Sequence, residues 1–297
     1  MNPAYLQPGD SVAITCPAKK LPHKIDEAVN LLKSWGLNVI LGETVYAEYN
    51  QYAGDDGLRT KDFQRFLDDP SIKAIFAARG GYGTVRIIDG IDFSGFALNP
   101  KWIVGFSDIT VIHSHIYANY QAQSIHGQMP LTIPDGTKRS LETLKKVLFN
   151  EALDYQYKSS IDNKPGEAKG VLIGGNLSLL ISMMGSVSEM NYNDKILFLE
   201  EVGEYLYSID RMMWILKRSG KLANLKGLII GGFTEIKDND IPFGKTAVEI
   251  INEHVSDYSY PVCYNFPAGH IEDNHALILG KTVNLKAGKR EVHLTYL

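Results

Sequence analysis

The first half of the chain alternates short apolar, β-branched runs with amphipathic helical segments. Strand signals fall at residues 11–15, 38–41, 72–78 and 102–106, and helical spacing of apolar residues falls at 24–35 and 58–67. Consecutive parallel strands need a crossover connection, usually a helix. This alternation therefore predicts an α/β fold with a parallel sheet and helices on both of its faces. Because ligands of such sheets gather at the carboxyl ends of the strands, the residues after each strand are the first candidates for a site.

The second half has a different character. The chain has 297 residues, enough for about two domains. Residues 159–166 are polar and poor in strand signals, and we interpret this region as a linker between an N-terminal domain, 1–150, and a C-terminal domain, 168–297. In the second domain, helices are expected from residue 177 and at 209–219 and 247–255, and strands at 170–176, 195–199, 227–233, 262–264, 276–279 and 292–296.

Composition excludes several classes of protein. Hydrophobic residues make up 44% and charged residues 22% of the chain, as in ordinary globular proteins. A formal net charge of −4 and no basic run argue against a nucleic-acid partner. The start of the chain lacks signal-peptide features, and no apolar run approaches the roughly 20 residues that span a bilayer. With only Cys16 and Cys263, we expect a cytoplasmic protein with reduced thiols and no membrane contact.

The segment Gly105-Phe106-Ser107-Asp108 follows a predicted strand and precedes a predicted helix. A serine on such a tight turn has its hydroxyl exposed, and the helix N-terminus behind it supplies unpaired N–H groups and partial positive charge. This is the arrangement of a nucleophile elbow. An acidic pair, Glu200-Glu201, and then His270 follow downstream. Serine, glutamate and histidine in this order suggest a covalent serine hydrolase.

Several motifs together resemble the LD-carboxypeptidase family of serine peptidases, which includes muramoyltetrapeptide carboxypeptidases and microcin C7 self-immunity proteins. They are, in order, Arg79-Gly80-Gly81-Tyr82-Gly83, Gly105-Phe106-Ser107-Asp108-Ile109-Thr110, Gly174-Gly175-Asn176-Leu177, Leu199-Glu200-Glu201-Val202-Gly203-Glu204 and Pro267-Ala268-Gly269-His270. The resemblance implies a Rossmann-like N-terminal domain, a C-terminal domain with β-barrel character, a groove between them and a homodimer. It also implies hydrolysis of the bond between an L-diamino acid and D-alanine in murein tetrapeptides, during cell-wall recycling.

The resemblance further implies a triad of Ser107 as nucleophile, His270 as base and Glu200 as its orienting anion. Backbone N–H groups of Gly81 and Asp108 are the expected oxyanion donors, since one such donor supplies about 3 kcal/mol to the transition state. We add Arg79, Tyr82, Asn176 and Glu204 as substrate-binding candidates. A small peptide is the expected substrate, and neither a metal nor an organic cofactor is expected.

Each of these residues has an alternative structural explanation. A serine after a strand is usually a helix N-cap, and a lone histidine is usually a loop residue. Glu201 and Glu204 compete with Glu200, although successive strand residues face opposite sides and only one of the adjacent pair can face the groove. Arg79 has an equal claim as a surface salt bridge, and the segment 174–176 as a tight turn.

Two other kinds of site are disfavoured. His113, His115 and His126 invite a zinc hypothesis, but residues two apart on a helix point away from each other. Cys16 ends the first strand, yet no neighbour marks it as a nucleophile.

Three other functions compete with the murein peptidase. The first is an immunity-type hydrolase of peptidyl or aminoacyl nucleotide amides, which needs an aromatic platform for the base; the chain offers only Trp35, Trp102 and Trp214. The second is a non-catalytic binding protein of two lobes. The third is a nucleotide-dependent enzyme using the segment 79–83, which lacks the GxGxxG pattern.

Overall fold

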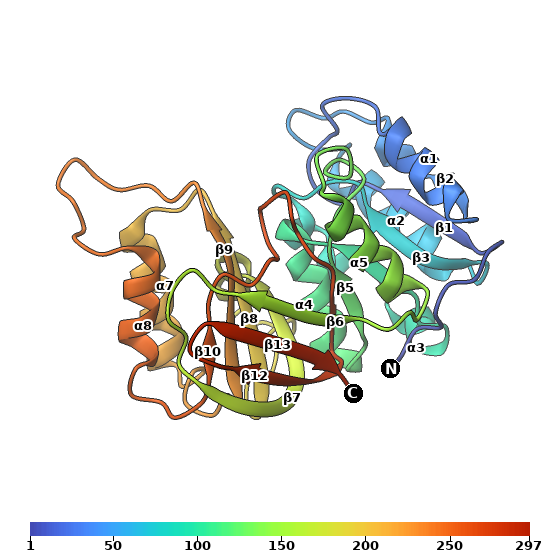
Figure 1. Cartoon of the computed structure of the whole chain (residues 1–297). Helices are drawn as coiled ribbons and strands as arrows, with labels where there is room; N and C mark the ends of the chain where they lie inside the picture. Colours follow the sequence, from blue (N-terminus) through green and yellow to red (C-terminus); the bar gives the residue numbers. More distant parts are fainter.

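The computed structural model describes residues 1–297 and contains two sheets with helices packed against them (Figure 1). The first sheet has the order β11-β5-β4-β3-β1-β2. Its strands are β1 (Ser11–Thr15), β2 (Asn38–Leu41), β3 (Ile72–Ala77), β4 (Trp102–Gly105), β5 (Ser124–His126) and β11 (Leu277–Leu279). All neighbouring pairs are parallel except β11 with β5, which is antiparallel. The predicted parallel sheet is therefore confirmed.

Alternate residues of these strands face two different layers of helices. Val12 and Ile14 of β1 pack with α1 (Asp26–Ser34) and α5 (Lys138–Leu148), whereas Ala13 packs with the layer on the other face. That layer holds α2 (Asp56–Asp68), α3 (Ser94–Leu98) and α4 (Thr110–Tyr120). Because side chains alternate along a strand, a sheet covered on both faces needs the nearly continuous apolar runs seen in the sequence.

The second sheet has the order β10-β9-β8-β7-β12-β13-β6. Its strands are β6 (Asp154–Lys158), β7 (Gly166–Asn176), β8 (Lys195–Val202), β9 (Gly227–Thr234), β10 (Val262–Cys263), β12 (Thr282–Ala287) and β13 (Glu291–Tyr296). The strands β7 to β10 are parallel and the others antiparallel. Helices α6 (Leu177–Ser182), α7 (Leu206–Arg218) and α8 (Ala247–Val255) cover one face of it.

The second sheet is an open ladder whose ends approach each other. Its edge strands β10 and β6 do not pair, but Lys164, shortly after β6, forms a two-hydrogen-bond bridge to Val262 of β10. Tyr157 of β6 also donates its hydroxyl to the carbonyl of Tyr264. The inner face encloses an apolar core that includes Leu172, Phe198 and Val292. These contacts give the sheet a strongly curved shape without closing a ladder.

Parts of the sequence interpretation were wrong. The strand β6, which precedes the predicted polar linker and pairs with β13, was not predicted. The strands β5 and β12 were not predicted either, and two 3₁₀ turns, η2 (Thr84–Arg86) and η3 (Ile88–Gly90), follow the glycine-rich segment 79–83. Strand β11 lies late in the sequence yet joins the first sheet. The division at 1–150 and 168–297 stays a prediction.

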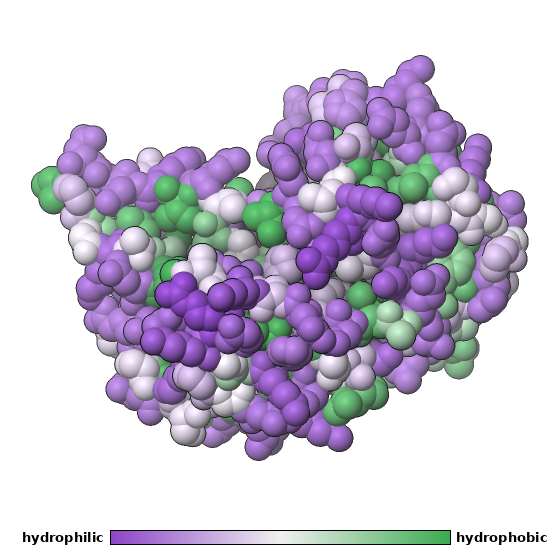
Figure 2. Space-filling model, in the orientation of Figure 1, coloured by the Kyte–Doolittle hydropathy of each residue, from purple (hydrophilic) through white to green (hydrophobic).

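The two sheets are joined through a continuous apolar core. Ile112 and Ile116 of α4 belong to the same buried cluster as Leu177 of α6 and Leu197 of β8. Figure 2 shows the surface hollowed between the two lobes. No helix of the structure is both long and apolar enough to cross a bilayer.

Candidate active site

Ser107 lies on a strained turn at the carboxyl end of β4. Its φ is +63°, in the left-handed region that residues other than glycine rarely adopt. The turn continues into η4 (Ser107–Ile109) and then α4, and neither helix start has a side-chain cap. The Ser107 hydroxyl makes no hydrogen bond and is partly exposed. Its geometry is therefore that of a nucleophile elbow, and the N-cap alternative does not apply.

His270 and Glu200 form a hydrogen-bonded pair 70 residues apart in sequence. The His270 Nδ1 lies 2.6 Å from Glu200 Oε2, and the Glu200 side chain is completely buried. Gly269 makes this approach possible: at its φ of +117°, a Cβ would lie 2.8 Å from the Cβ of Glu200. Burial by itself lowers the pKa of His270, but the adjacent Glu200 carboxylate and its hydrogen bond, with Glu201 and Glu235 farther away, raise it above its ordinary value.

Glu201 points the other way and has a structural task. Its Oε2 accepts from the Ser178 N–H at 2.8 Å and from the Ser178 hydroxyl, and its Oε1 accepts from Asn176 Nδ2 at 2.9 Å. Asn176 in turn caps α6 by accepting from the Leu179 N–H. Both the nitrogen and the oxygen of the Asn176 side-chain amide thus have hydrogen-bond partners within the protein. The alternation of strand faces explains why Glu200, and not Glu201, contacts His270.

Two contacts bring the serine and histidine regions together across the sheets. The ring of Phe106 meets the His270 imidazole edge to face, with centroids 4.9 Å apart. The Thr110 hydroxyl, at the start of α4, accepts from the Asn176 N–H at the end of β7. Ser107 Oγ and His270 are not hydrogen-bonded to each other in this structure. In unliganded enzymes such catalytic contacts are often long and tighten when substrate binds.

The glycine-rich loop after β3 lies directly against the nucleophile. A Cβ on Gly80 would lie 2.9 Å from Ser107 Cβ and 3.3 Å from the Asp108 nitrogen, so only glycine permits this approach. The next residue, Gly81, has an N–H with no acceptor in the protein, while Tyr82 is 45% exposed. The structure thus brings both predicted oxyanion donors to the same small region.

Two cations stand near this loop without an acidic partner. Arg79 is partly buried and donates to the Lys20 carbonyl, but it forms no ion pair. The salt-bridge alternative for Arg79 therefore fails. Lys19, which the sequence patterns did not single out, lies along Gly81, where a Cβ would touch its aliphatic chain.

Two acidic residues follow neighbouring strands of the second sheet, Glu204 after β8 and Glu235 after β9. The backbone carbonyl of Glu204 accepts from the Lys237 N–H at 2.9 Å, and its half-buried side chain forms no ion pair. Glu235 follows β9, with φ at +52°, and its charge acts on His270. In the sequence, the only signal for Glu235 is its position shortly after a predicted strand.

The histidines considered for zinc are engaged separately. His113 Nε2 lies 2.9 Å from the Gly105 carbonyl, and His115 Nδ1 lies 2.9 Å from Ser188 Oγ. His126 is completely buried between the rings of Phe106 and Phe198. No three potential ligands converge in the structure.

Both cysteines are free thiols with no exposed surface. Burial raises the pKa of Cys16 and of Cys263 to about 12, so both thiols stay protonated at neutral pH.

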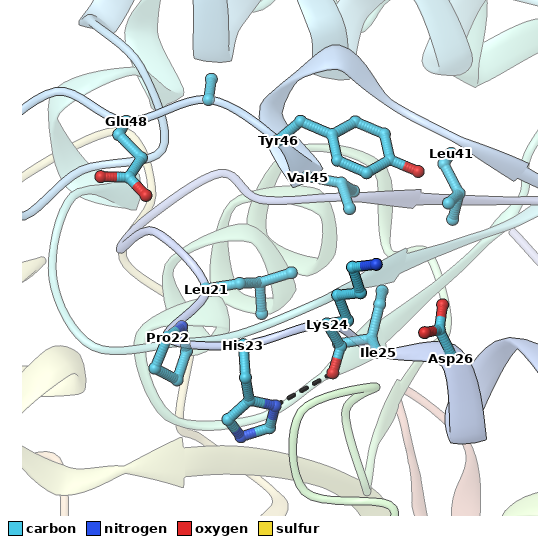
Figure 3. A pocket seen from close by; sticks show the side chains of 11 residues that line it. Leu21, Pro22, His23, Lys24, Ile25, Asp26, Leu41, Val45, Tyr46 and Glu48 are labelled. Atoms are coloured by element: carbon cyan, nitrogen blue, oxygen red, sulfur yellow. Dashed lines mark hydrogen bonds between the residues drawn. The ribbon is translucent and has the colours of Figure 1, made fainter.

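A cavity of about 330 Å³ lies elsewhere in the N-terminal part, between residues 21–26 and residues 41–48 (Figure 3). In it, His23 Nδ1 lies 2.9 Å from the Lys24 carbonyl. None of the predicted site residues lines this cavity. It is therefore separate from the Ser107 region.

Two models of known protein domains and several named relatives match this chain. The model of the LD-carboxypeptidase N-terminal domain matches residues 12–127, and that of the LD-carboxypeptidase C-terminal domain matches residues 169–285. A probable murein peptide carboxypeptidase of Bacillus subtilis is 33% identical, over 98% of this chain and 96% of its own length. The murein tetrapeptide carboxypeptidase of Pseudomonas aeruginosa is 30% identical, over 95% of both chains.

Solved structures share the fold across nearly the whole chain. The muramoyltetrapeptide carboxypeptidase of Oxalobacter formigenes superposes with a TM-score of 0.87 at 29% identity, over 96% of this chain and 98% of the other. The microcin C7 self-immunity protein superposes with a TM-score of 0.88 at 20% identity, over 99% of this chain and 98% of the other, which shows the fold alone. With both domain models matched and the serine turn in place, the chain belongs to the LD-carboxypeptidase family of serine peptidases.

Proposed function

We propose that this enzyme hydrolyses the bond between the L-centre of a diamino acid and the terminal D-alanine of murein tetrapeptides, through a Ser107–His270–Glu200 triad. One observation carries the proposal. The strained Ser107 turn and the buried Glu200–His270 pair come from different sheets, yet the Phe106–His270 contact brings them together. The named activities of the Bacillus and Pseudomonas relatives support the same substrate class.

In the acylation step, Ser107 Oγ attacks the carbonyl carbon of the diamino acid. His270 takes the serine proton on Nε2, because the Glu200 carboxylate, bonded to Nδ1, leaves Nε2 as the free ring nitrogen. The buried Glu200 charge also stabilises the imidazolium that forms. Collapse of the tetrahedral adduct breaks the C–N bond, and His270 returns the proton to the D-alanine amine. The product is an acyl-enzyme on Ser107.

The oxyanion of that adduct needs preorganised donors. The N–H of Asp108 follows the nucleophile, and the free N–H of Gly81 stands on the loop that Gly80 brings against Ser107. Donors fixed before the reaction cost no reorganisation as charge develops. Deacylation repeats the geometry: His270 takes a proton from water, the hydroxide attacks the ester carbonyl, and the proton returns to Ser107.

Substrate selection is assigned to the rims of the site. We assign Arg79, which lacks an acidic partner, to the terminal carboxylate of D-alanine. We assign the side-chain ammonium of the diamino acid to Glu204 and Glu235, which follow neighbouring strands of the second sheet. Tyr82 offers an exposed ring for the peptide. The Asn176 side chain caps α6 and donates to Glu201, so we assign it a role in shaping the site and not in binding the peptide.

The direct test is product analysis by mass spectrometry on purified murein tetrapeptides. We expect release of D-alanine and a tripeptide, with no release from a peptide ending in L-alanine. A serine-directed phosphonate should modify Ser107 in the native enzyme and nothing in Ser107→Ala. A protein that leaves the tetrapeptide intact and Ser107 unlabelled is a binding protein, and the proposal is then wrong.

The immunity-type hydrolase is tested in the same assay with an acyl-sulfamoyl adenosine. Trp102 is buried at the amino end of β4, whereas Ser107 follows the carboxyl end of that strand. The indole N–H of Trp102 donates to the carbonyl of Ala4. Trp214 packs on His254 between α7 and α8, and Trp35 ends α1. None of the tryptophans provides a platform for a base at the site, so we expect the tetrapeptide to be cleaved far faster.

We also propose that the enzyme works in the cytoplasm as a homodimer, as its family resemblance implies. Sedimentation equilibrium at micromolar concentration should give twice the mass of one chain. Cell fractionation should recover activity with the cytoplasmic proteins.

A further inference from the structure

The carboxylate of Asp108 is a buried charged group that the mechanism above leaves without a task. Only the backbone N–H of Asp108 is assigned to the oxyanion. The residue has no exposed surface, and burial raises the pKa of its carboxyl above the ordinary value. An acid buried beside a nucleophile costs stability unless its contacts offset it, so those contacts indicate its purpose.

Asp108 contacts the residue that ends the glycine-rich loop. Its Oδ2 accepts from the Thr84 N–H at 2.8 Å. Its Oδ1 and the Thr84 hydroxyl are both buried without a partner elsewhere. A second side chain fixes the same end of the loop. Arg59 Nη1 donates to the carbonyl of Gly83, at 2.9 Å, and also to the carbonyl of Pro17.

The other end of the loop lies on the nucleophile. Gly80 approaches Ser107 so closely that a Cβ would be 3.0 Å from Ser107 Oγ. Gly81 follows, with φ at +107° and its N–H free. A four-residue glycine-rich loop has little conformational preference of its own. Its position over Ser107 therefore depends on how its ends are fixed.

We propose that the Asp108 carboxylate is a positioning residue that fastens Thr84, and with it the loop 80–83, so that the Gly81 N–H stands beside the Asp108 N–H as the second oxyanion donor. One residue then supplies a donor from its backbone and places the other donor with its side chain. The inference rests on the proposed function, because it assigns the oxyanion role to these two N–H groups.

The experiment compares Asp108→Ala with Asp108→Asn. Asparagine keeps an oxygen that accepts from the Thr84 N–H, whereas alanine removes it. We expect Asp108→Ala to lower kcat roughly 100-fold, the scale of losing one oxyanion donor, with little change in KM. Asp108→Asn should recover most of that loss. The matched control is Asp62→Ala, since Asp62 is also buried and accepts from the N–H and hydroxyl of a threonine, Thr44, which does not belong to the loop 80–83.

A second readout separates positioning from general destabilisation. A tripeptide aldehyde adds Ser107 Oγ to its carbonyl and places the resulting oxygen in the oxyanion hole, whereas the tripeptide product makes no such adduct. Asp108→Ala should weaken aldehyde binding by about the same factor as kcat, and product binding hardly at all. Asp62→Ala should lower the melting temperature and leave the ratio of the two affinities unchanged.

Equal loss of aldehyde and product affinity, or an unchanged kcat in Asp108→Ala, overturns the proposal while leaving the proposed function intact. If the native enzyme fails to cleave tetrapeptides, the proposed function is wrong, and hydrogen exchange still decides the placement of the loop. Peptides covering residues 80–86 should lose protection in Asp108→Ala and keep it in Asp108→Asn. Unchanged exchange in both variants excludes a positioning role for the carboxylate.

Discussion

The ring of Phe106 packs edge to face against the imidazole of His270, their centroids 4.9 Å apart. Phe106 immediately precedes the proposed nucleophile, and its ring also packs against the buried ring of His126. One aromatic side chain thus connects the first sheet to the loop that carries the base. Such pairs contribute about 1 kcal/mol beyond the area they bury, so the contact bears on both stability and alignment.

Phe106→Leu should separate these two effects. Leucine retains apolar bulk, so we expect a loss of about 1 kcal/mol in the free energy of unfolding. The edge contact with His270 is lost, and kcat should fall while KM stays near the native value. Urea unfolding and steady-state kinetics measure the two quantities. A native kcat in this variant would show that the ring does not align the base.

Ser107→Ala and Ser107→Gly should both abolish turnover with the fold intact. They should differ in stability, because alanine keeps a Cβ in the left-handed region and glycine does not. We expect Ser107→Gly to be more stable than Ser107→Ala by about 1 kcal/mol. Chemical denaturation of the pair checks this. More than a few per cent of native turnover in either variant contradicts the covalent mechanism.

The pH dependence follows from the raised pKa of His270. The base works only when neutral, so kcat/KM should rise with pH through a midpoint above the ordinary histidine value of about 6.5. In Glu200→Gln the raising charge is removed, and the midpoint should move to lower pH as the rate falls. NMR titration of the His270 ring measures this pKa directly. An activity that stays flat from pH 5 to 8 removes His270 as the base.

The titration of His270 also affects stability, but stability should fall as the pH rises, whereas activity should rise. Its folded pKa lies above its unfolded pKa, so protonated His270 stabilises the fold fully below the unfolded value. That contribution is lost as the pH rises through the folded pKa. In Glu200→Gln, the free energy of unfolding should no longer depend on the protonation of His270. Denaturation of this variant and of the native protein at a series of pH values from acidic to neutral measures the difference.

The adjacent acids should give opposite phenotypes. Glu201→Gln disturbs the bonds to Ser178 and Asn176 that hold the start of α6, and should cost about 2 kcal/mol of stability. Its kcat per folded molecule should stay close to native. Glu200→Gln should instead lose most of its rate. Thermal unfolding beside single-turnover kinetics compares them, and a larger rate loss for Glu201→Gln would reverse the assignment.

Arg79→Ala should raise KM for the tetrapeptide, since it removes the guanidinium proposed to hold the terminal carboxylate. A tetrapeptide amide lacks that carboxylate, so its slow cleavage should be insensitive to the substitution. Arg79→Lys keeps the charge but not the paired N–H geometry, and should be intermediate. Equal effects on acid and amide substrates would assign Arg79 to holding the Lys20 loop only.

Much of the architecture follows from local patterns. The strand–helix alternation of residues 11–106 predicted the parallel sheet, and α8 was predicted at its observed bounds. The strands β5, β6 and β12 were missed: polar residues alternate with apolar ones in β6 and β12, and β5 has a single aliphatic residue. Strand β11 was predicted, but its place in the first sheet was not, because pairing between distant segments leaves no trace in local sequence.

For the site, the sequence by itself determined the chemical groups: a serine on a strand-to-helix turn, adjacent acids whose alternation allows only one to face the groove, a histidine after Pro-Ala-Gly, and a glycine-rich loop. Only the tertiary structure decided how they are used. It paired Glu200 with His270, occupied Asn176 with Glu201, left Arg79 without an acidic partner, and laid Lys19 and the Asp108–Thr84 contact beside the nucleophile. The physical reason is that backbone preferences act over a few residues, whereas burial and charge pairing depend on which distant segments meet in space.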